Sequence, residues 1–111
     1  MPDAIDRMVI EELREIMEEG FSELLAVFLA DSARQYQALD GDWRAGRQDG
    51  LHKLAHSLKG CCSNIGAIEC ASIAAGMERA ARAGDWGRFP EQMAAFDSAL
   101  QRAHDDLRDL V

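Results

Sequence analysis

"HKLAHSLKGCCSNIGA", residues 52–67, places His56 between Lys53 and Lys59, the only two lysines of the chain. The ten other basic residues are arginines. On a helical wheel of about 100° per residue, the apolar side chains of this stretch gather within roughly 60° of the pole opposite His56. This stripe predicts a helix whose back is buried and whose imidazole faces solvent. The stripe consists of Leu51, Leu54, Leu58, Cys61, Cys62 and Ile65.

The opposite face of this helix is polar and contains a glycine, Gly60, one turn after His56. A side chain at that position would lie beside the imidazole ring. A glycine inside a helix costs roughly 1 kcal/mol relative to alanine. We therefore interpret Gly60, and the small Ser63 one turn further, as leaving the ring accessible to a partner. The alternative is that Gly60 permits close helix packing or a bend. The residues within about 60° of His56 are His52, Lys53, Lys59, Gly60 and Ser63.

Helical periodicity extends along the whole chain, and no segment alternates apolar and polar residues as a strand does. Short connections between long amphipathic helices favour antiparallel neighbours. We therefore expect an all-α fold, an antiparallel up-down four-helix bundle with an additional N-terminal helix. Whether the second helix passes Gly41 is left open. The expected helices run from the cap Asp3 to Gly20, from about Ser22 to Leu39, from Leu51 to Ile65, from Ala67 to Ala83, and from Pro90 to Leu110. The apolar positions expected to face inward include Met8, Ile16 and Met17 in the first of these helices and Ile68, Ile73 and Met77 in the fourth.

Length and charge bound the function. The 111 residues predict one domain over 1–111, with the bundle core at about 20–110. A net charge of −8 argues against nucleic acid as a partner. No run approaches the roughly 20 apolar residues of a membrane span, and the start has no signal-peptide pattern, so we expect a cytoplasmic protein. Met1 favours a free-standing protein, although an excised kinase domain would look the same. The three cysteines are interpreted as buried thiols in a reducing compartment, with a redox role as the alternative.

Three interpretations of an exposed His56 are considered. A neutral imidazole can act as a nucleophile toward phosphoryl groups, with Lys59 neutralising the phosphoryl oxygens and Lys53 assisting approach. A metal site is disfavoured, because His52 and His56 have no third ligand and lie among lysines. The third interpretation is a solvated histidine in a docking patch.

The segments "AHSLKG" (55–60) and "NIGA" (64–67) resemble the signature of the histidine-containing phosphotransfer (HPt) family of two-component phosphorelays. The resemblance extends to "AG" at 45–46 and to "MERAARAGD" at 77–85. It implies a helical bundle, a phosphorylated His56, a phosphate-assisting Lys59 and a partner-admitting Gly60. The departures are the two cysteines after Gly60 and the histidine at position 52, which leaves a docking or tuning role open. Glu78 stands where the family often has Glu, and we assign it only to surface or inter-helix pairing.

The sequence has no Walker loop, glycine-rich ATP lid or acidic Mg²⁺ cluster, so we expect no ATP chemistry on this chain. The resemblance implies a monomeric phosphocarrier, not an enzyme. His56 would take a phosphoryl group from a receiver domain of a hybrid histidine kinase and pass it to the Asp of a response regulator. No cofactor is expected on this chain, and Mg²⁺ belongs to the receiver. Residues 41–88 contain seven bases and five acids, a balance that suits an acidic receiver pocket. The alternative function is a helical interaction module that binds a receiver without phosphotransfer.

Overall fold

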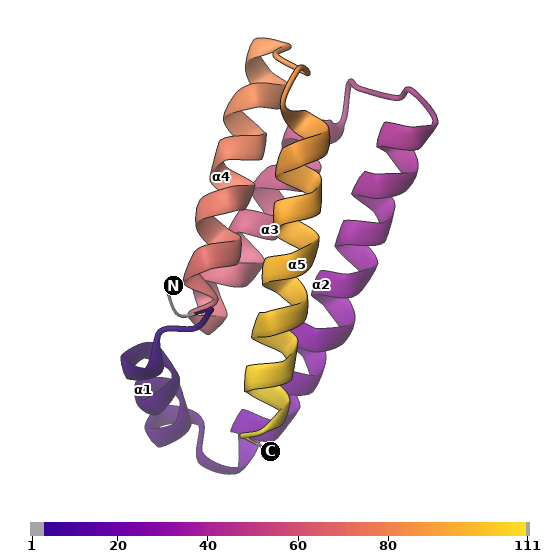
Figure 1. Cartoon of the computed structure of the whole chain (residues 1–111). Helices are drawn as coiled ribbons and strands as arrows, with labels where there is room; N and C mark the ends of the chain where they lie inside the picture. Colours follow the sequence, from indigo (N-terminus) through magenta and orange to yellow (C-terminus); the bar gives the residue numbers. More distant parts are fainter. Residues whose placement is uncertain (1–3, 111) are drawn as a thin grey trace.

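The computed structural model describes residues 4–110, which are helical apart from their connections (Figure 1). A 3₁₀ turn, η1 (Glu18–Gly20), joins the first helix to the second. No strand occurs within residues 4–110, so the predicted all-helical class is confirmed. The α-helices are α1 (Arg7–Met17), α2 (Phe21–Arg44), α3 (Leu51–Ile65), α4 (Ile68–Ala83) and α5 (Phe89–Arg108).

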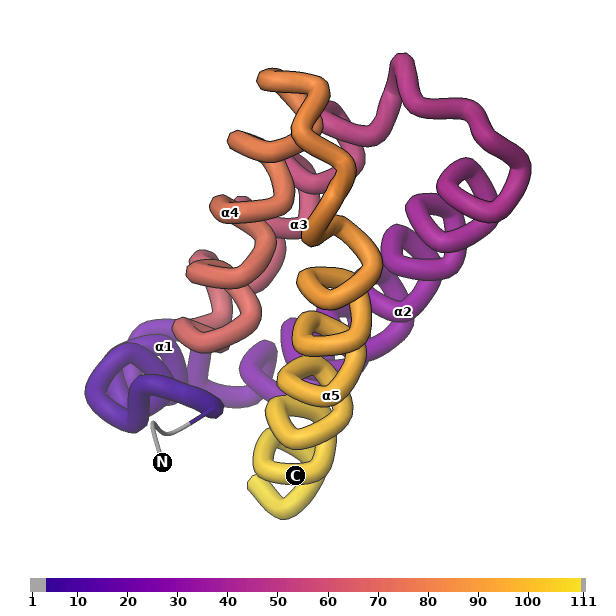
Figure 2. The backbone as a smooth tube through the Cα atoms, turned by 45° about the horizontal axis from the view of Figure 1, so that its top comes forward, coloured from indigo at the N-terminus to yellow at the C-terminus, as the bar shows by residue number. Residues whose placement is uncertain are grey.

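The helices α2 to α5 lie side by side along a molecule of 42 × 26 × 19 Å, and α1 lies at one end (Figures 1 and 2). The helix α3 packs against α4 on one side and α2 on the other, and α5 packs against α4 and α2. Each helix contributes an apolar stripe to one core. The fully buried large side chains include Leu25, Leu39, Leu51, Leu58, Met77, Phe89, Phe96 and Leu107.

Aromatic rings close the end of the bundle opposite α1. The ring centroids of Trp43 and Trp86 are 5.8 Å apart, and both rings pack on buried Phe89 at 5.0 and 5.2 Å. This packing explains why α2 continues through Gly41 to Arg44, a point that the sequence left open. The helix must extend that far to bring Trp43 to the core, and such burial outweighs the roughly 1 kcal/mol cost of a helical glycine.

Gly66 ends α3 and anchors α1. Its φ of 80° is left-handed, and its carbonyl accepts a 2.7 Å hydrogen bond from the Asp6 N–H. A Cβ at position 66 would lie 3.1 Å from the Cβ of Val9. Glycine therefore satisfies both the backbone geometry and the close approach of α1.

The ends and faces of some helices differ from the prediction. The helix α1 begins after Asp6, whose carboxylate caps it, while the predicted cap, Asp3, lies outside the described residues. Met8 and Ile16 are 75% and 77% exposed, so their predicted inward orientation is wrong. The reason is that α1 touches the bundle along one side only, and Ile10 is its one buried residue. Met17 and Ile68 are also exposed, and both lie at helix ends.

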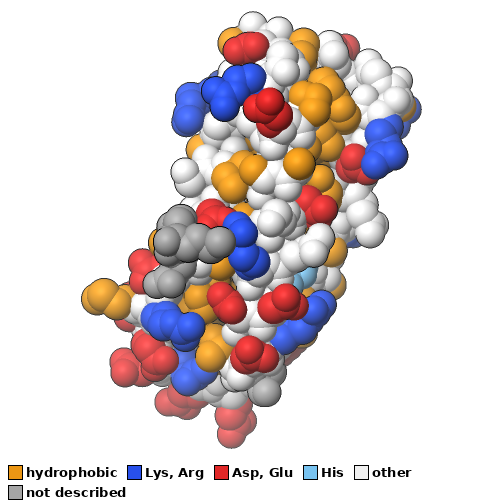
Figure 3. Space-filling model, viewed as in Figure 1, with side chains coloured by type: hydrophobic (Ala, Val, Ile, Leu, Met, Phe, Trp, Pro, Cys, Tyr) orange, Lys and Arg blue, Asp and Glu red, His pale blue; other side chains and the backbone are white. Residues whose placement is uncertain are grey.

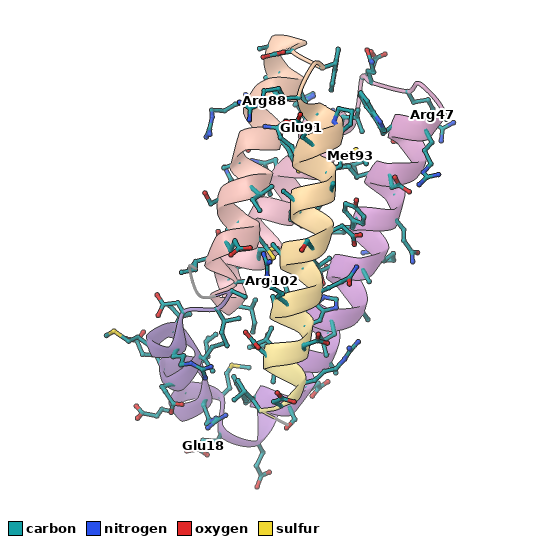
Figure 4. The ribbon with its side chains drawn as sticks, viewed as in Figure 1. Glu18, Arg47, Arg88, Glu91, Met93 and Arg102 are labelled. Atoms are coloured by element: carbon teal, nitrogen blue, oxygen red, sulfur yellow. The ribbon has the colours of Figure 1, made fainter. Side chains whose placement is uncertain are left out.

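A partly exposed ion pair links α4 to α5. Arg102 of α5 reaches toward α4 (Figure 4), where its guanidinium pairs with the carboxylate of Glu69.

No helix among residues 4–110 combines the length and the apolar character that crossing a membrane requires.

Candidate functional site

The exposed face of α3 carries His56 near the middle of the helix. The side chain of His56 is 61% exposed, while the residues on the opposite face are buried, as the helical wheel predicted. Leu54 and Cys61 lie at the edge of the core rather than inside it, and His52 and Lys59 are half-buried rather than fully exposed. These differences arise because α3 is flanked by both α2 and α4.

The imidazole of His56 is held by a carboxylate from the neighbouring helix. Its Nδ1 lies 3.2 and 3.1 Å from Oε1 and Oε2 of Glu78 on α4. An ionised carboxylate only accepts hydrogen bonds, so the neutral ring carries its proton on Nδ1. The lone pair then resides on Nε2, which has no hydrogen-bond partner among residues 4–110. The arrangement selects the Nδ1–H tautomer and leaves a nucleophilic nitrogen toward solvent.

Glu78 gathers two cations besides the imidazole. Lys59 Nζ lies 3.1 Å from Oε1, and Arg82 contacts Oε2 at 3.1 Å. The hydrogen bond from Lys59 is the main cause that lowers the pKa of Glu78 to about 2, against the opposing effect of burial, and the hydrogen bond from His56 adds to it. The carboxylate is therefore ionised at neutral pH although Glu78 is 7% exposed.

Glu78 has a larger part in the site than the surface or inter-helix pairing predicted for it, because it contacts both predicted site residues, His56 and Lys59. A signal was present, because Glu78 and Arg82 are spaced i,i+4 and form a pair on one helix face. What the sequence did not show is that this face of α4 turns toward α3.

The flank of the ring at Gly60 is open. A Cβ built at this position has no atom within 4 Å, so helix packing does not require a glycine there. Ser63, one turn further, is exposed. Lys53 is exposed and His52 half-buried, and neither forms a hydrogen bond or ion pair within residues 4–110.

A groove of about 320 Å³ runs on the α2 side of α3, whereas Glu78 lies on the α4 side. Phe28 and Ile65 form its apolar floor, and Val27, 58% exposed, stands on its wall. A 2.7 Å hydrogen bond from the Ser57 hydroxyl to the Gln35 side chain bridges the two helices at its edge. An accessible apolar surface therefore lies next to the imidazole-bearing face.

Other chemistries find less support in the described residues. Residues 4–110 contain no group of three or more His, Cys, Asp and Glu side chains placed to hold a metal ion. Cys62 and Cys70 are buried, and Cys61 is half-buried, where burial raises its pKa to about 11. A hydrogen bond to Cys70 raises the pKa of Cys62 further. Such thiols are poor nucleophiles at neutral pH.

Charge is distributed unevenly over the molecule. Acidic side chains gather at the end that carries α1, whereas acids and bases are interspersed over α4 and α5 (Figure 3). Lys59 and Arg82 place positive charge beside His56. The imidazole thus faces solvent from a locally cationic surface on an acidic protein.

A family model described as "Hpt domain" matches residues 23–109. This chain belongs to the Hpt domain family. A similar solved structure is the crystal structure of histidine-containing phosphotransfer protein B (HptB) from Pseudomonas aeruginosa PAO1. It is 28% identical in sequence, has a TM-score of 0.93, and the match covers 98% of this chain and 95% of that one. A comparison with curated proteins finds no match. The family supports a phosphorelay role in general, in which Hpt proteins carry phosphoryl groups and interact with receiver domains.

Proposed function

We propose that this chain is a phosphorelay intermediate whose phosphorylated residue is His56. It accepts a phosphoryl group from the phospho-aspartate of a receiver domain, in a hybrid histidine kinase, and passes it to the Asp of a response regulator. The observation that supports this proposal most directly is the state of the imidazole. Nδ1 is engaged by a buried carboxylate, whereas Nε2 has no hydrogen-bond partner among residues 4–110 and belongs to an exposed side chain in a member of the Hpt family.

Transfer proceeds by displacement at phosphorus. The Nε2 lone pair forms the N–P bond as the P–O bond to the receiver's aspartate breaks, and the bonding electrons return to that carboxylate. Lys59 lies 3.1 Å from Glu78 and can turn toward the incoming phosphoryl oxygens, where its charge offsets theirs. The Mg²⁺ that the reaction requires belongs to the receiver. This chain contributes no ATP site and acts as a carrier.

Docking uses the open side of α3. Gly60 and Ser63 leave room for the receiver's phosphorylation pocket beside the ring. The groove between α2 and α3 offers an apolar surface that other parts of the receiver contact. Lys53 and His52 lie one turn away and contact neither His56 nor Glu78, so we assign them at most a minor part in docking or tuning. We propose a monomer with α2 to α5 as the antiparallel up-down four-helix bundle and α1 as the additional N-terminal helix.

The test is incubation with a receiver domain that carries a labelled phosphoryl group. The expected product is acid-labile, base-stable phosphate on this chain, which is typical of phosphohistidine. His56→Gln should accept none, and His52→Gln, the matched control one turn away, should accept label normally. The alternative, an interaction module, predicts a complex with the receiver and no label on the chain.

A further inference from the structure

The proton on Nδ1 acquires a second role once Nε2 carries a phosphoryl group. When Nε2 attacks phosphorus, the ring keeps its Nδ1 proton and becomes a cation. In the return step, the N–P bond breaks and its electrons go back to Nε2. If Nδ1 is still protonated, the ring leaves as neutral imidazole. If that proton has been lost, the ring must leave as imidazolate, a much stronger base and a much poorer leaving group.

We infer that Glu78 keeps Nδ1 protonated in the phosphorylated state, so that His56 leaves phosphorus as a neutral imidazole. The inference rests on the proposed function and extends it from phosphoryl uptake to phosphoryl release. Glu78 touches neither phosphorus nor the receiver. It is a positioning residue, which acts through the imidazole that it contacts at 3.1 and 3.2 Å.

The charges around the ring favour this assignment. The ionised Glu78 is in direct contact with Nδ1, and a negative charge at that distance stabilises the protonated form of the ring. Lys59 and Arg82 oppose ring protonation, but both are themselves paired with Glu78, and the phosphoryl group draws Lys59 away from the ring proton.

The other packed surfaces contribute little charge at the ring. On α2, the contact beside His56 is the neutral bond between Ser57 and Gln35. The charged residue that lines the groove, Asp31, pairs with Arg34. On α3 itself, His52 and Lys53 lie one turn before the ring and make no contact with Glu78. The carboxylate is thus the only anion of the described residues in contact with the imidazole.

Glu78→Gln separates charge from geometry. The amide oxygen of Gln can accept from a protonated Nδ1, and its NH₂ group can donate to a deprotonated one, so the variant holds the ring without preferring either form.

The protein is phosphorylated chemically with phosphoramidate, which requires no receiver. The ³¹P resonance of phospho-His56, identified by its absence from His56→Gln, is then followed as the pH is raised.

We expect the titration midpoint of the phosphorylated wild-type ring to lie at least about one pH unit above that of Glu78→Gln. Transfer from the phosphorylated chain to a receiver should be similar for the two proteins below both midpoints. Between the midpoints the wild type should transfer up to about tenfold faster, because each pH unit above a midpoint removes tenfold of the protonated form.

Two further variants make the test independent of folding defects. Glu69→Gln removes another carboxylate of α4, paired with Arg102 and not with His56, and should titrate like the wild type. Arg82→Gln removes an exposed cation that shares Glu78 and should move the midpoint upward. Superposed ³¹P titrations for wild type, Glu78→Gln and Arg82→Gln would overturn the inference. Failure of the proposed function is a different result, in which a phospho-receiver does not label the chain although phosphoramidate does.

Discussion

His56 and His104 each hydrogen-bond to a side chain of a neighbouring helix, but through different ring nitrogens. His56 engages Nδ1 with a carboxylate and leaves Nε2 toward solvent. His104 on α5 engages Nε2 with the hydroxyl of Ser32 on α2 at 3.0 Å, and its ring packs edge-on to Phe28 with centroids 5.7 Å apart. The Ser32 hydroxyl donates to the Phe28 carbonyl, so it accepts from the Nε2–H of His104. His56 is a candidate nucleophile because its Nε2 is left without a partner on an exposed side chain. His104 is a structural residue because its Nε2 is engaged and its ring is half-buried.

The largest effect should separate these two histidines outright. His56→Gln is expected to abolish phosphoryl uptake from a phospho-receiver, while His104→Gln keeps it. Because His56 faces solvent, its replacement should change the free energy of unfolding by no more than roughly 0.5 kcal/mol. Labelling and thermal melting of both variants check this. Label on His56→Gln would assign the site to a histidine other than His56, and its loss on His104→Gln would assign it to His104.

Gly60→Gln should reduce transfer without loss of stability. A side chain at position 60 meets nothing in the protein but projects beside the imidazole, where it keeps the receiver at a distance. A displacement of about 1 Å in such a reaction costs on the order of 100-fold in rate. Glutamine is also the better helix former by something under 1 kcal/mol, so the melting temperature should hold or rise.

Gly41→Gln is the matched control for this substitution. Gly41 is also an exposed helical glycine whose Cβ would meet nothing within 4 Å, but it lies near the end of α2, away from His56. The control should gain stability and keep normal transfer. If Gly60→Gln melts at a lower temperature than the wild type, the glycine serves the helix rather than the partner.

The sequence predicted those parts of the molecule that one helix determines. The buried and exposed faces of α3 and the all-helical class follow from periodicity. The buried and exposed faces of α1 could not be predicted in this way, because apolar periodicity in a peripheral helix does not show that the bundle covers it. Met8 and Ile16 have the spacing of core residues and lie in solvent.

The candidate site followed from sequence only where its residues share a helix. His56, Lys59 and Gly60 belong to one turn, and their relation could be read from spacing. Glu78 joins them from a helix 22 residues later in the chain. Its part depends on the rotation of α4 relative to α3, which inter-helix packing sets and local periodicity does not reveal.

Lys59→Ala should have a smaller effect than the substitution at Gly60. A partly exposed cation contributes about 1 kcal/mol, so transfer should slow by about tenfold or less, with receiver affinity almost unchanged. The reason is that Lys59 acts on the moving phosphoryl group rather than on the docked surface. Rapid-quench transfer rates and a binding titration separate the two quantities. Lys53→Ala, on the same face but without a contact to Glu78, is the control and should transfer at nearly the wild-type rate. Equal losses in both lysine variants would indicate general electrostatic attraction instead.

The smallest effect concerns the pH dependence of stability at His104. Burial lowers the pKa of His104 below its usual value of 6.5, with the charge of Arg108 acting in the same direction and Asp105 against it. The folded protein therefore binds fewer protons here than the unfolded chain does, and its stability rises with pH in this range. The contribution is fully present above about pH 6.5 and is lost as the pH falls through the lowered folded pKa. Because the ring is only half-buried, we expect less than about 1 kcal/mol. Urea unfolding of wild type and His104→Gln between pH 7.5 and 5.5 measures it, since all other groups are common to the two proteins and cancel in the difference. The wild type should lose stability relative to the variant as the pH falls. Parallel curves would mean that Ser32 and Phe28 hold the ring equally well in either charge state.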